Sequence, residues 1–489
     1  MSATGLGWIA VVLYVAVAAA LALRGARRTR SLASYAVGGR DIPAPVVGLS
    51  LAAQLTSVAT FVINPGLVHA FGYAALLGYG VAAALGITLG LALFSTRFRR
   101  HGVRVQALSV PQWIGARYES PGLRAVFALL SLGLVTFATL IVVGLSLVLA
   151  RLLGQPPGAV ALVMTALVVA GVMLGGATGH AWTNAAQAAV MLVVALVLIG
   201  AGLPLLAGAG ITPRLAAIDP NLVGAVNPAS PYFRSVFEVF VCNFLVGLAI
   251  VCQPHVLSKA LYLREERDVR RYLATAIACG IVFSGVLVTG LWARLTLAGP
   301  QPIDRVIPTW IAQTFPPEVQ VLIAIGLLCA GLSTLEGILL ALSAIFSVDV
   351  YPLLAHGKAE RGALVFGRLG LVLVALVTAG FALWQIEHPT GGTVAIFAQY
   401  GVYLLFTASF LPLGCGMFVP RAGRRLVGAA VAVALVGYLG TAILKPTALA
   451  NNPAVLATVG ILAGWLVVAT GLMAGRGARG APPGVAGAS

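Results

Sequence analysis

The sequence predicts an all-α polytopic membrane protein, and three observations support this prediction. Hydrophobic residues make up 60% of the 489 residues and charged residues only 9%, whereas soluble domains carry about 25% charged residues. The apolar residues form runs long enough to cross a bilayer. These runs are continuous and do not alternate with polar residues, which excludes an outer-membrane barrel. A soluble enzyme, a disordered protein and a domain held by one anchor helix are excluded as well.

A transmembrane helix needs about 20 apolar residues, and thirteen segments meet this requirement. They lie near residues 6–23, 44–70, 73–95, 122–149, 157–174, 182–208, 234–253, 272–297, 319–347, 364–384, 393–418, 426–444 and 453–474. Residues 110–120 mix aromatic, apolar and basic side chains, which predicts a short interfacial helix. Residues 209–233 are expected to form a polar outside loop. We expect one transporter domain over 1–474 and a disordered Gly/Pro/Ala-rich tail over 475–489.

The positive charges orient these helices. The net charge of +17 would suggest a nucleic-acid partner in a soluble protein, but here topology explains it and no such partner is expected. Nearly all Lys and Arg residues fall on one side, in the stretches 24–40, 97–124, 259–271, 358–368, 421–425 and 476–479. The other side holds only Arg151, Arg214, Arg234, Arg294, Arg305 and Lys445. The positive-inside rule therefore predicts an outside N-terminus and a cytoplasmic C-terminus in the cell inner membrane.

Polar residues inside the spans mark candidate sites, because an unpartnered polar group is costly in lipid. Gln54, Thr56, Ser57, Thr60 and Asn64 crowd the second span. A single Ser or Thr often bonds to its own helix, but five polar residues in eleven positions favour a cavity. The sequence Asn64-Pro65-Gly66 predicts a bend or an interruption.

Five segments, in order, resemble the sodium:solute symporter family. SLASYAVGGR (31–40) followed by LSLAAQLTSVATF (49–61) is similar to the entry and second helix of that family, and ALSVPQWIGARY (107–118) to its interfacial stretch. WTNAAQAAVM (182–191) resembles its sixth-helix motif, QPHVLSKAL (253–261) the end of its seventh helix, and LSTLEGILLALSAIFSVDVYP (332–352) its ninth helix.

The resemblance implies an inverted-repeat (5+5) fold with helices broken at the midplane. Helices 2–6 and 7–11 would form the two repeats, and helices 1, 12 and 13 would be peripheral. It also implies a sodium site made of the carbonyls of Ala53, Thr56 and Ala330 and the hydroxyls of Ser333 and Thr334. Neutral hard oxygens of this kind suit a monovalent cation.

The same resemblance places substrate near Gln54, Ser57, Asn243, Gln399 and Tyr403. Asn184 stands where many members of the family carry Asp, so we expect a single coupling ion. Glu336, three residues after Ser333, is either a buried neutral carboxyl or a group that takes part in proton or substrate coupling. Glu238 is expected to be either solvated or paired with Arg234 rather than to bind a ligand, and Lys259 to pair with a carboxylate or a lipid phosphate.

The sequence thus predicts a sodium-coupled symporter that moves a small organic solute, with a monocarboxylate or similar organic anion as our choice. Na⁺ is the expected coupling ion, with no organic cofactor and no enzymatic activity. A proton-coupled symporter using Glu336 remains open, as do amino acids, sugars or other metabolites as substrate and a transporter-like membrane sensor. Apart from the solute and the lipid bilayer no partner is indicated, and the oligomeric state stays open, a monomer included.

Overall fold

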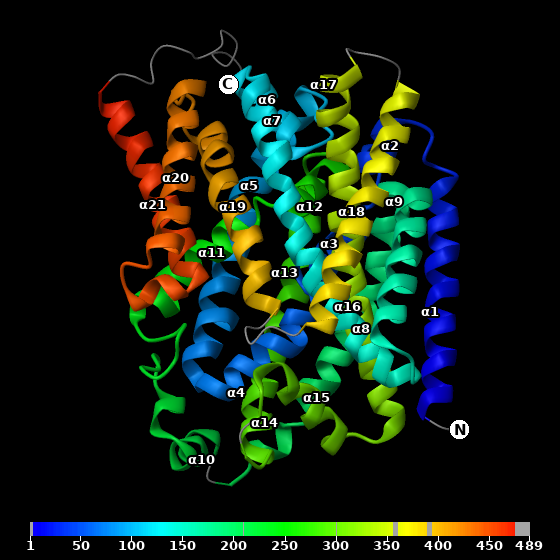
Figure 1. Cartoon of the computed structure of the whole chain (residues 1–489), viewed down its shortest axis with the longest axis vertical. Coiled ribbons are helices and arrows are strands. Elements are labelled where there is room, and N and C mark those ends of the chain that lie inside the picture. The colour runs from blue at the N-terminus through cyan, green and yellow to red at the C-terminus, as the bar shows by residue number, and fades with distance from the viewer. Residues whose placement is uncertain (1–2, 209, 300, 356–359, 389–393, 475–489) are drawn as a thin grey trace.

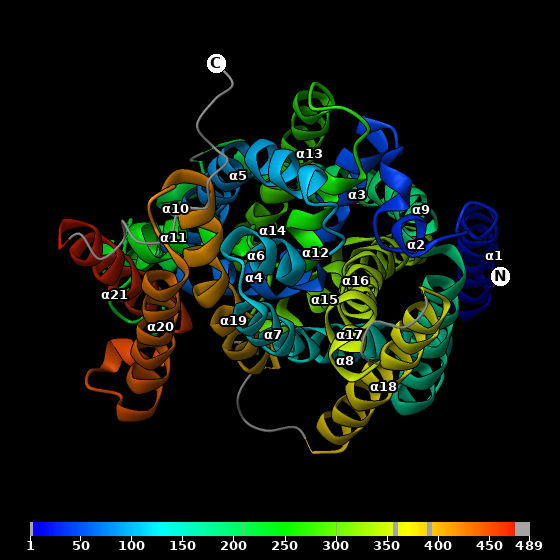
Figure 2. The same cartoon turned by 90° about the horizontal axis from the view of Figure 1, so that it is seen from above.

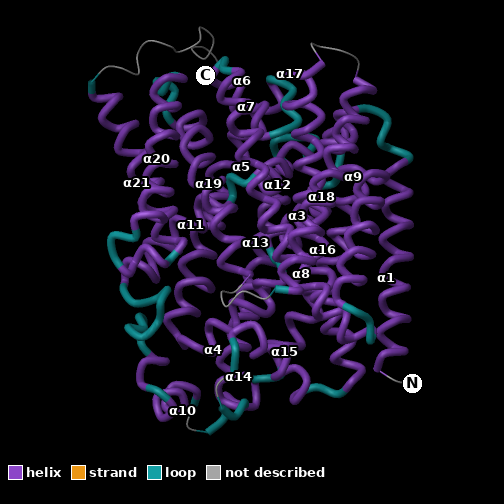
Figure 3. The backbone as a smooth tube through the Cα atoms, in the orientation of Figure 1, coloured by secondary structure: helices purple, strands orange, loops and turns teal. Residues whose placement is uncertain are grey.

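The computed structural model describes residues 3–208, 210–299, 301–355, 360–388 and 394–474, where the chain consists of helices joined by loops and has no strand (Figure 3). The longer helices of the first half are α1 (Ala3–Ala26), α2 (Leu32–Val37), α3 (Ala44–Leu55), α4 (Asn64–Ala75), α5 (Ala84–Arg104), α6 (Val110–Tyr118), α7 (Pro121–Leu130), α8 (Leu134–Leu153), α9 (Pro157–Gly200) and α10 (Ile211–Ile218). Those of the second half are α11 (Asn243–Ile250), α12 (Pro254–Leu257), α13 (Asp268–Gly285), α14 (Thr289–Thr296), α15 (Ile303–Thr314), α16 (Pro317–Ile345), α17 (Tyr351–Ala355), α18 (Glu360–Glu387), α19 (Val394–Phe418), α20 (Arg424–Leu444) and α21 (Pro453–Met473).

Short 3₁₀ and π-helical segments join or continue these helices. The π-helical ones are η2 (Ala59–Ile63), η3 (Leu76–Ala83), η7 (Phe237–Cys242) and η10 (Phe346–Val350). The 3₁₀ ones are η1 (Gly38–Arg40), η4 (Ser131–Gly133), η5 (Leu203–Leu206), η6 (Pro220–Val223), η8 (Ser258–Tyr262), η9 (Val286–Val288) and η11 (Ala448–Asn451). Single π-helical turns inside longer helices often lie at functional sites.

The structure confirms the all-α membrane class. Within the described residues, 10 helices are long and apolar enough to cross a membrane, and 11 if the bent pair Phe237–Ile250 and Pro254–Tyr262 is one span. Two of these helices each contain two spans. The helix over Ala59–Arg104 changes direction at Gly72 in α4, and the helix over Pro157–Leu206 changes direction at Gly176 in α9, because the backbone leaves helical geometry at these glycines. Dividing them there gives the thirteen segments that the sequence predicts.

Both direction changes need glycine. Gly72 has φ 62° and ψ −138°, and Gly176 has φ 51° and ψ −155°, a region that residues with a side chain rarely adopt. A Cβ on Gly72 would also lie 2.0 Å from the carbonyl oxygen of Leu222. The turn at Gly72, between the second and third spans, therefore packs directly against Leu222 of the segment that follows the sixth span.

Two segments outside the spans differ in how well the sequence predicts them. The interfacial helix is present as α6, which begins after Ser109, whose Oγ accepts from the amide of Gln112 at 3.0 Å. The outside segment 209–233, expected to be a loop, contains α10 and η6 instead. The fully buried Leu215 fixes α10 to the bundle, and this tertiary burial supplies the stability that so short a helix lacks alone.

The helices are layered from the edge of the bundle to its centre. The beginning of α1 and the end of α21 lie at opposite ends of the molecule, as an odd number of spans requires (Figure 1). Seen from above, α1 lies at one edge and α20 with α21 at the opposite edge (Figure 2). In the most apolar stretch of α1 only 11% of the residues are buried, whereas in that of α16 83% of the residues are buried. α16 is thus the central helix, and it packs against α3, α8 and α9.

Candidate ion and solute site

The second span is interrupted between α3 and η2, beside the centre of the bundle. Thr56 has an extended backbone (φ −112°, ψ 101°), and neither Thr56 nor Ser57 is helical. The Ser57 hydroxyl then accepts from the amide of Ala59 at 3.2 Å and so begins the next helical segment. No Gly or Pro causes this break. It leaves carbonyl groups at the end of α3 without their usual partners four residues later.

The hydroxyls of α16 meet these carbonyls. Ser333 Oγ lies 3.0 Å from the carbonyl oxygen of Ala53 and 3.0 Å from that of Ala330. Thr334 Oγ1 lies 3.1 Å from the carbonyl oxygen of Gln54 and 3.2 Å from that of Ala330. All five residues are buried. All five predicted sodium-site residues are therefore linked by hydrogen bonds, because the amide of Thr56, at the break, also donates to the carbonyl oxygen of Ala53 at 3.1 Å.

This arrangement is chemically suited to a small monovalent cation. It gathers carbonyl and hydroxyl oxygens, which are hard neutral ligands, and it has no carboxylate among them. A hydroxyl can turn its hydrogen away and offer a lone pair, so the same contacts can serve a cation once it enters. Within the described residues, no group of three His, Cys, Asp or Glu side chains could hold a metal ion, and the neutral-oxygen cluster is the ion-site candidate that the geometry favours.

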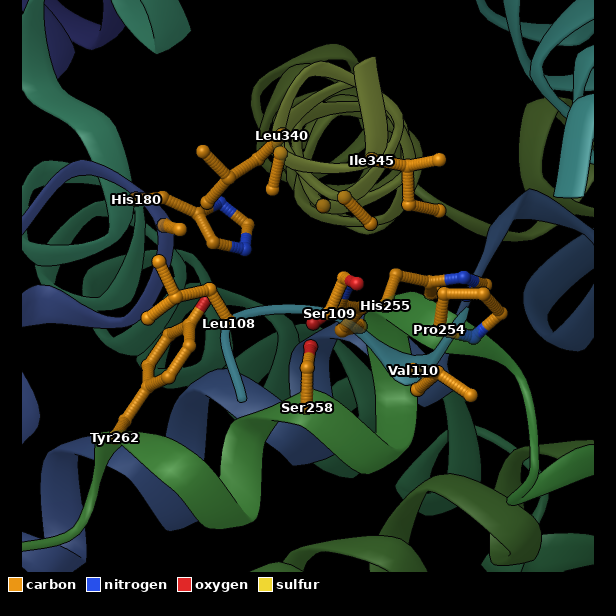
Figure 4. A pocket seen from close by; sticks show the side chains of 15 residues that line it. Leu108, Ser109, Val110, His180, Pro254, His255, Ser258, Tyr262, Leu340 and Ile345 are labelled. Carbon is orange, nitrogen blue, oxygen red and sulfur yellow. The ribbon is translucent and has the colours of Figure 1, made fainter. Parts of the chain in front are cut away.

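The predicted substrate residues fall into two sets. Gln54 is buried against Gly337 of α16, and neither its amide nitrogen nor its amide oxygen has a hydrogen-bond partner. It borders a pocket between α2, α9, α16 and the loop before α6, together with His180, His255 and Tyr262 (Figure 4). An unpartnered buried amide next to a pocket is the expected sign of a group that a ligand or water satisfies.

The other set surrounds η3. Gln399 on α19 interacts with the hydroxyl of Tyr79, and Tyr403 lies in the same group. Asn243 packs against Gly78, but its amide nitrogen bonds to carbonyls of its own helix, including that of Glu238 at 2.8 Å. α19 and α3 lie on different sides of the bundle centre (Figure 2). Among the described residues, the contacts of these side chains thus do not join the two sets.

Glu336 lies behind the ion-site candidate, on the face of α16 that meets α9. Its Oε2 is 3.4 Å from Nδ1 of His180, and its side chain is 12% exposed. The exposed part faces an apolar groove between α1, α8, α9 and α16, which Tyr14 also lines. The carboxyl group therefore lies in a dry environment with a histidine as its nearest titratable neighbour.

Lys259 and Asn184 connect α3 to the rest of this region. The Lys259 ammonium donates to Ser50 Oγ at 2.7 Å and is fully buried. The Asn184 amide nitrogen donates to the carbonyl oxygens of Ser50 (3.4 Å) and Ser333 (3.2 Å). The expectation that Lys259 pairs with a lipid phosphate is wrong, because burial against α3 removes it from any headgroup.

The sequence pattern of the sodium:solute symporter family matches residues 35–437 of this chain. The chain belongs to the sodium:solute symporter family. Its relatives include the sodium/pantothenate symporters of Escherichia coli, 26% identical over 87% of each chain, and of Haemophilus influenzae, 24% identical over 74% of this chain and 75% of the relative. The sodium/sialic acid symporter NanT of Aliivibrio fischeri is 22% identical, over 76% and 75% of the two chains.

The fold is also shared with a solved structure. The substrate-bound, outward-open structure of a Na⁺-coupled sialic acid symporter superposes with a TM-score of 0.81 at 16% identity, over 96% of this chain and 97% of the other. The inverted-repeat fold is thereby confirmed. The interruption expected in the second span lies at Thr56 and Ser57, and the seventh span bends by 59° between α11 and α12.

Two further buried ion pairs hold the ends of the bundle. At the end of the bundle that carries α6 and α7, Asp349 accepts from Ser109 Oγ at 2.5 Å and from Arg124 Nε at 2.7 Å, which ties these two helices to η10. At the opposite end Glu238 pairs with Arg234 at 3.0 Å, which is one of the two expected alternatives, and accepts from Asn452 Nδ2 at 3.2 Å. The carboxylate of Glu238 is fully buried, so the alternative that it is solvated is wrong.

Sequence reasoning missed His180 and Ser50. His180, treated as one of several scattered histidines, shares a face of α9 with Asn184 and Gln187, at positions i, i+4 and i+7. Ser50 lies one turn before Ala53 on α3. The available signal was a row of polar residues at helical spacing on an otherwise apolar span. It could be recognised only by comparing such rows on different helices.

Proposed function

We propose that this protein couples the downhill entry of one sodium ion to the uptake of a small organic solute by alternating access. The observation that carries the proposal is the meeting of the Ser333 and Thr334 hydroxyls with the carbonyl groups at the break after α3. Sodium would bind among Ala53, Thr56, Ala330, Ser333 and Thr334. A membrane potential of 100 mV would add about 2.3 kcal/mol per sodium ion carried inward.

The coupling follows from the position of the site between α3 and α16. A cation bound to oxygens of both helices holds the broken end of α3 against α16, and it stabilises the conformation in which the oxygens converge. Loss of sodium on the low-sodium side releases that link. The inner arginine contacts, including Arg124 with Asp349, would have to open before solute can leave to the cytoplasm.

The proposed solute is a small organic anion such as a monocarboxylate. Pantothenate and sialic acid, the solutes for which the relatives described above are named, both carry a carboxylate. Gln54 and Ser57 would contact the solute from the break, and Gln399, Tyr403 and Asn243 from the η3 side. An amide, hydroxyl groups and the exposed amides of a broken helix can bind a carboxylate without a buried Arg.

The proposed location is the cell inner membrane, with the N-terminus outside and the C-terminus in the cytoplasm. The arginine-rich helix ends around α2, α6 and α7 gather at the end of the molecule where α21 finishes (Figure 1). The helical outside segment with α10 lies at the other end. This separation of charge agrees with the positive-inside rule.

Uptake into proteoliposomes tests the proposal. Purified protein is assayed with a panel of labelled carboxylates, amino acids and sugars, with an inward sodium gradient or with choline in its place. We expect sodium-dependent uptake of at least one carboxylate, lost in the double variant Ser333→Ala/Thr334→Ala. Sodium-independent uptake that the double variant leaves unchanged would refute the sodium site.

Glu336 beside His180 supports proton coupling as the second candidate. The same liposomes with an inward proton gradient and no sodium distinguish the two. If uptake is driven by protons alone and is lost in Glu336→Gln but not in Ser333→Ala, the coupling ion is the proton. Uptake that needs sodium in the parent protein assigns coupling to sodium.

A further inference from the structure

Helix α1 is fixed to the bundle at three points, and one of its faces stays open. Near its start, a Cβ on Gly7 would lie 2.8 Å from a leucine side chain of α8, and near its end a Cβ on Gly25 would lie 2.6 Å from the backbone of Gly179 on α9. Small residues allow such close approach between membrane helices. Between these two contacts the hydroxyl of Tyr14 accepts from Gln187 Nε2 at 2.6 Å.

The open face of α1 borders a groove of about 600 Å³, which we call the α1 groove. One wall is α1 from Trp8 to Leu23, and the other is the first arm of α9, residues 159–174, which runs beside α1 (Figure 1). On this second wall Val163 is 61% and Leu167 47% exposed in the protein. Because both helices are candidate membrane spans, these apolar side chains lie at the depth of the lipid hydrocarbon.

The length and surface of the α1 groove fit one acyl chain. From Trp8 to Leu23 the groove is about 22 Å long at 1.5 Å per helical residue, which exceeds the roughly 15 Å of hydrocarbon in one leaflet. The polar side chains on its floor, Thr183, His180 and Glu336, are each at most 9% exposed. A lipid tail in the groove would therefore meet an almost entirely apolar surface.

A group of exposed arginines, the arginine cluster, follows directly on the groove. It comprises Arg24, Arg27, Arg28 and Arg30. The amide of Arg27 still bonds to the carbonyl oxygen of Leu23 at 3.4 Å, so this last turn carries the cluster onward from the groove wall. No Asp or Glu precedes Asp41 in the sequence, and none of the ion pairs in the described part of the chain involves the cluster. Such a cluster at the end of a span is typical of binding to anionic lipid.

We propose that the α1 groove holds one acyl chain of an anionic glycerophospholipid whose phosphate binds the arginine cluster. An apolar wall alone accepts any lipid tail, and the cluster adds the preference for a negative headgroup. The floor of the groove includes Leu328 and Leu332 of α16, so the bound tail packs between α1 and the central helix. A lipid held in this way stabilises the folded protein. The inference does not rest on the proposed function.

Lipid titrations of the purified full-length protein in neutral detergent test the inference. Native mass spectrometry counts the lipids bound, and thermal unfolding gives the affinity. The probes are phosphatidylglycerol with palmitoyl and oleoyl tails, phosphatidylcholine with the same tails, and soluble glycerol 3-phosphate. We expect one phosphatidylglycerol to bind saturably, phosphatidylcholine to bind roughly 10- to 100-fold more weakly, and glycerol 3-phosphate to give no stabilisation because it has no tail.

The headgroup contact is tested by the triple variant Arg27→Gln/Arg28→Gln/Arg30→Gln. Arg24 stays in place because its guanidinium lies 5.9 Å from the centre of the Trp182 ring. Each arginine at the membrane surface favours an anionic lipid by about fivefold, so the triple variant should bind phosphatidylglycerol on the order of 100-fold more weakly. The matched control removes three other exposed arginines, beside the start of α20, and should leave the affinity unchanged. It is Arg421→Gln/Arg424→Gln/Arg425→Gln.

The tail contact is tested by Gly171→Phe, which fills the middle of the α1 groove. Gly171 lines the groove, and a Cβ there meets no heavy atom within 4 Å, so the variant should fold. Its affinity for both phospholipids should fall at least about tenfold, because the tail loses apolar contact over several carbons. The matched control is Gly380→Phe on α18, which is exposed and equally open but lies outside the groove.

Loss of phosphatidylglycerol binding in both test variants, with both controls unchanged, supports the inference. Equal binding of the two phospholipids, unaffected by the arginine variant, overturns it and indicates ordinary boundary lipid. Stabilisation by glycerol 3-phosphate, or full affinity in Gly171→Phe, overturns it as well, because the phosphate then binds without a tail in the groove. A dimer that Gly171→Phe dissociates would show a second copy of the chain in the groove instead. If the triple variant does not fold, the comparison of the two phospholipids on the parent protein decides.

Discussion

Replacing Ser333 by alanine is the most direct perturbation of the ion-site candidate. Its hydroxyl lies 3.0 Å from the carbonyl oxygens of both Ala53 and Ala330, and its side chain is fully buried. The substitution removes one of the proposed sodium ligands and adds no bulk. Neither carbonyl becomes wholly unpaired, because Ala53 also accepts from the Thr56 amide and Ala330 from Thr334.

The expected loss can be estimated from this geometry. A polar contact to a charged group contributes about 1.5 to 3 kcal/mol, which corresponds to a rise of about 10- to 150-fold in the half-saturating sodium concentration. Loss of the neutral hydrogen bond in the sodium-free protein costs only about 1 kcal/mol. The variant should therefore fold, with a modest decrease in melting temperature, and lose mainly sodium affinity.

The assay measures uptake into proteoliposomes as a function of sodium, together with sodium-dependent thermal stabilisation. The matched control is Ser131→Ala, another buried serine, whose hydroxyl bonds to the carbonyl of Phe127 in its own helix turn at 2.7 Å. Thr334→Ser, which keeps the hydroxyl at the site, should stay within a few-fold of the parent protein. If Ser333→Ala and Ser131→Ala have the same half-saturating sodium concentration, Ser333 does not bind sodium and the reasoning fails.

Three further predictions concern stability and topology. Arg124→Leu leaves the buried Asp349 carboxylate without its cation and should lower the free energy of unfolding by about 3 to 5 kcal/mol. The control Arg100→Leu removes an exposed ion pair with Glu266 and should lower it by at most about 1 kcal/mol. Equal melting temperatures of the two variants would contradict this prediction. The hydrogen bond from Arg100 lowers the pKa of the Glu266 carboxyl, so the small deficit of Arg100→Leu should be present at neutral pH and vanish as the pH falls through that lowered pKa. Gly66→Ala places a Cβ 2.1 Å from the carbonyl oxygen of Ile303 and should sharply reduce the amount of folded protein seen in size-exclusion chromatography. The control Gly428→Ala on α20 places its Cβ in open space and should leave the stability of the protein unchanged or raise it slightly. Finally, Arg305→Cys should react with a membrane-impermeant maleimide in intact cells and Arg267→Cys only after permeabilisation; the reverse pattern would invert the proposed topology.

Much of the fold could be predicted because lipid imposes a simple rule on sequence. Every spanning segment must be apolar and internally hydrogen-bonded, so the thirteen runs and their charged ends could be located directly. The helical outside segment could not, because α10 depends on burying Leu215 against distant helices. The break at Thr56 and Ser57 has no Gly or Pro to mark it, and only the resemblance to the symporter family indicated it.

The ion-site residues were identified by resemblance, and their contacts depend on tertiary packing. Ser333 and Ala53 are far apart in sequence, and no spacing rule states that a hydroxyl on α16 reaches a carbonyl on α3. The same is true of the neighbours of Lys259. Its predicted position near the inner end of a span suggested a carboxylate or a lipid phosphate as its partner, whereas the side chain is buried and donates to Ser50.

By itself the sequence determined which segments are apolar enough to lie in the membrane and predicted which way they face, because composition and the placement of Arg and Lys act locally along the chain. Tertiary structure alone decided which polar groups meet at the centre. The low charged fraction left few carboxylates and ammonium groups, and packing of α3, α9 and α16 brought Lys259, Asn184 and the neutral oxygens into one hydrogen-bonded region. Electrostatic interactions there act between helices, through a medium that excludes water, and no property of one helix specifies them.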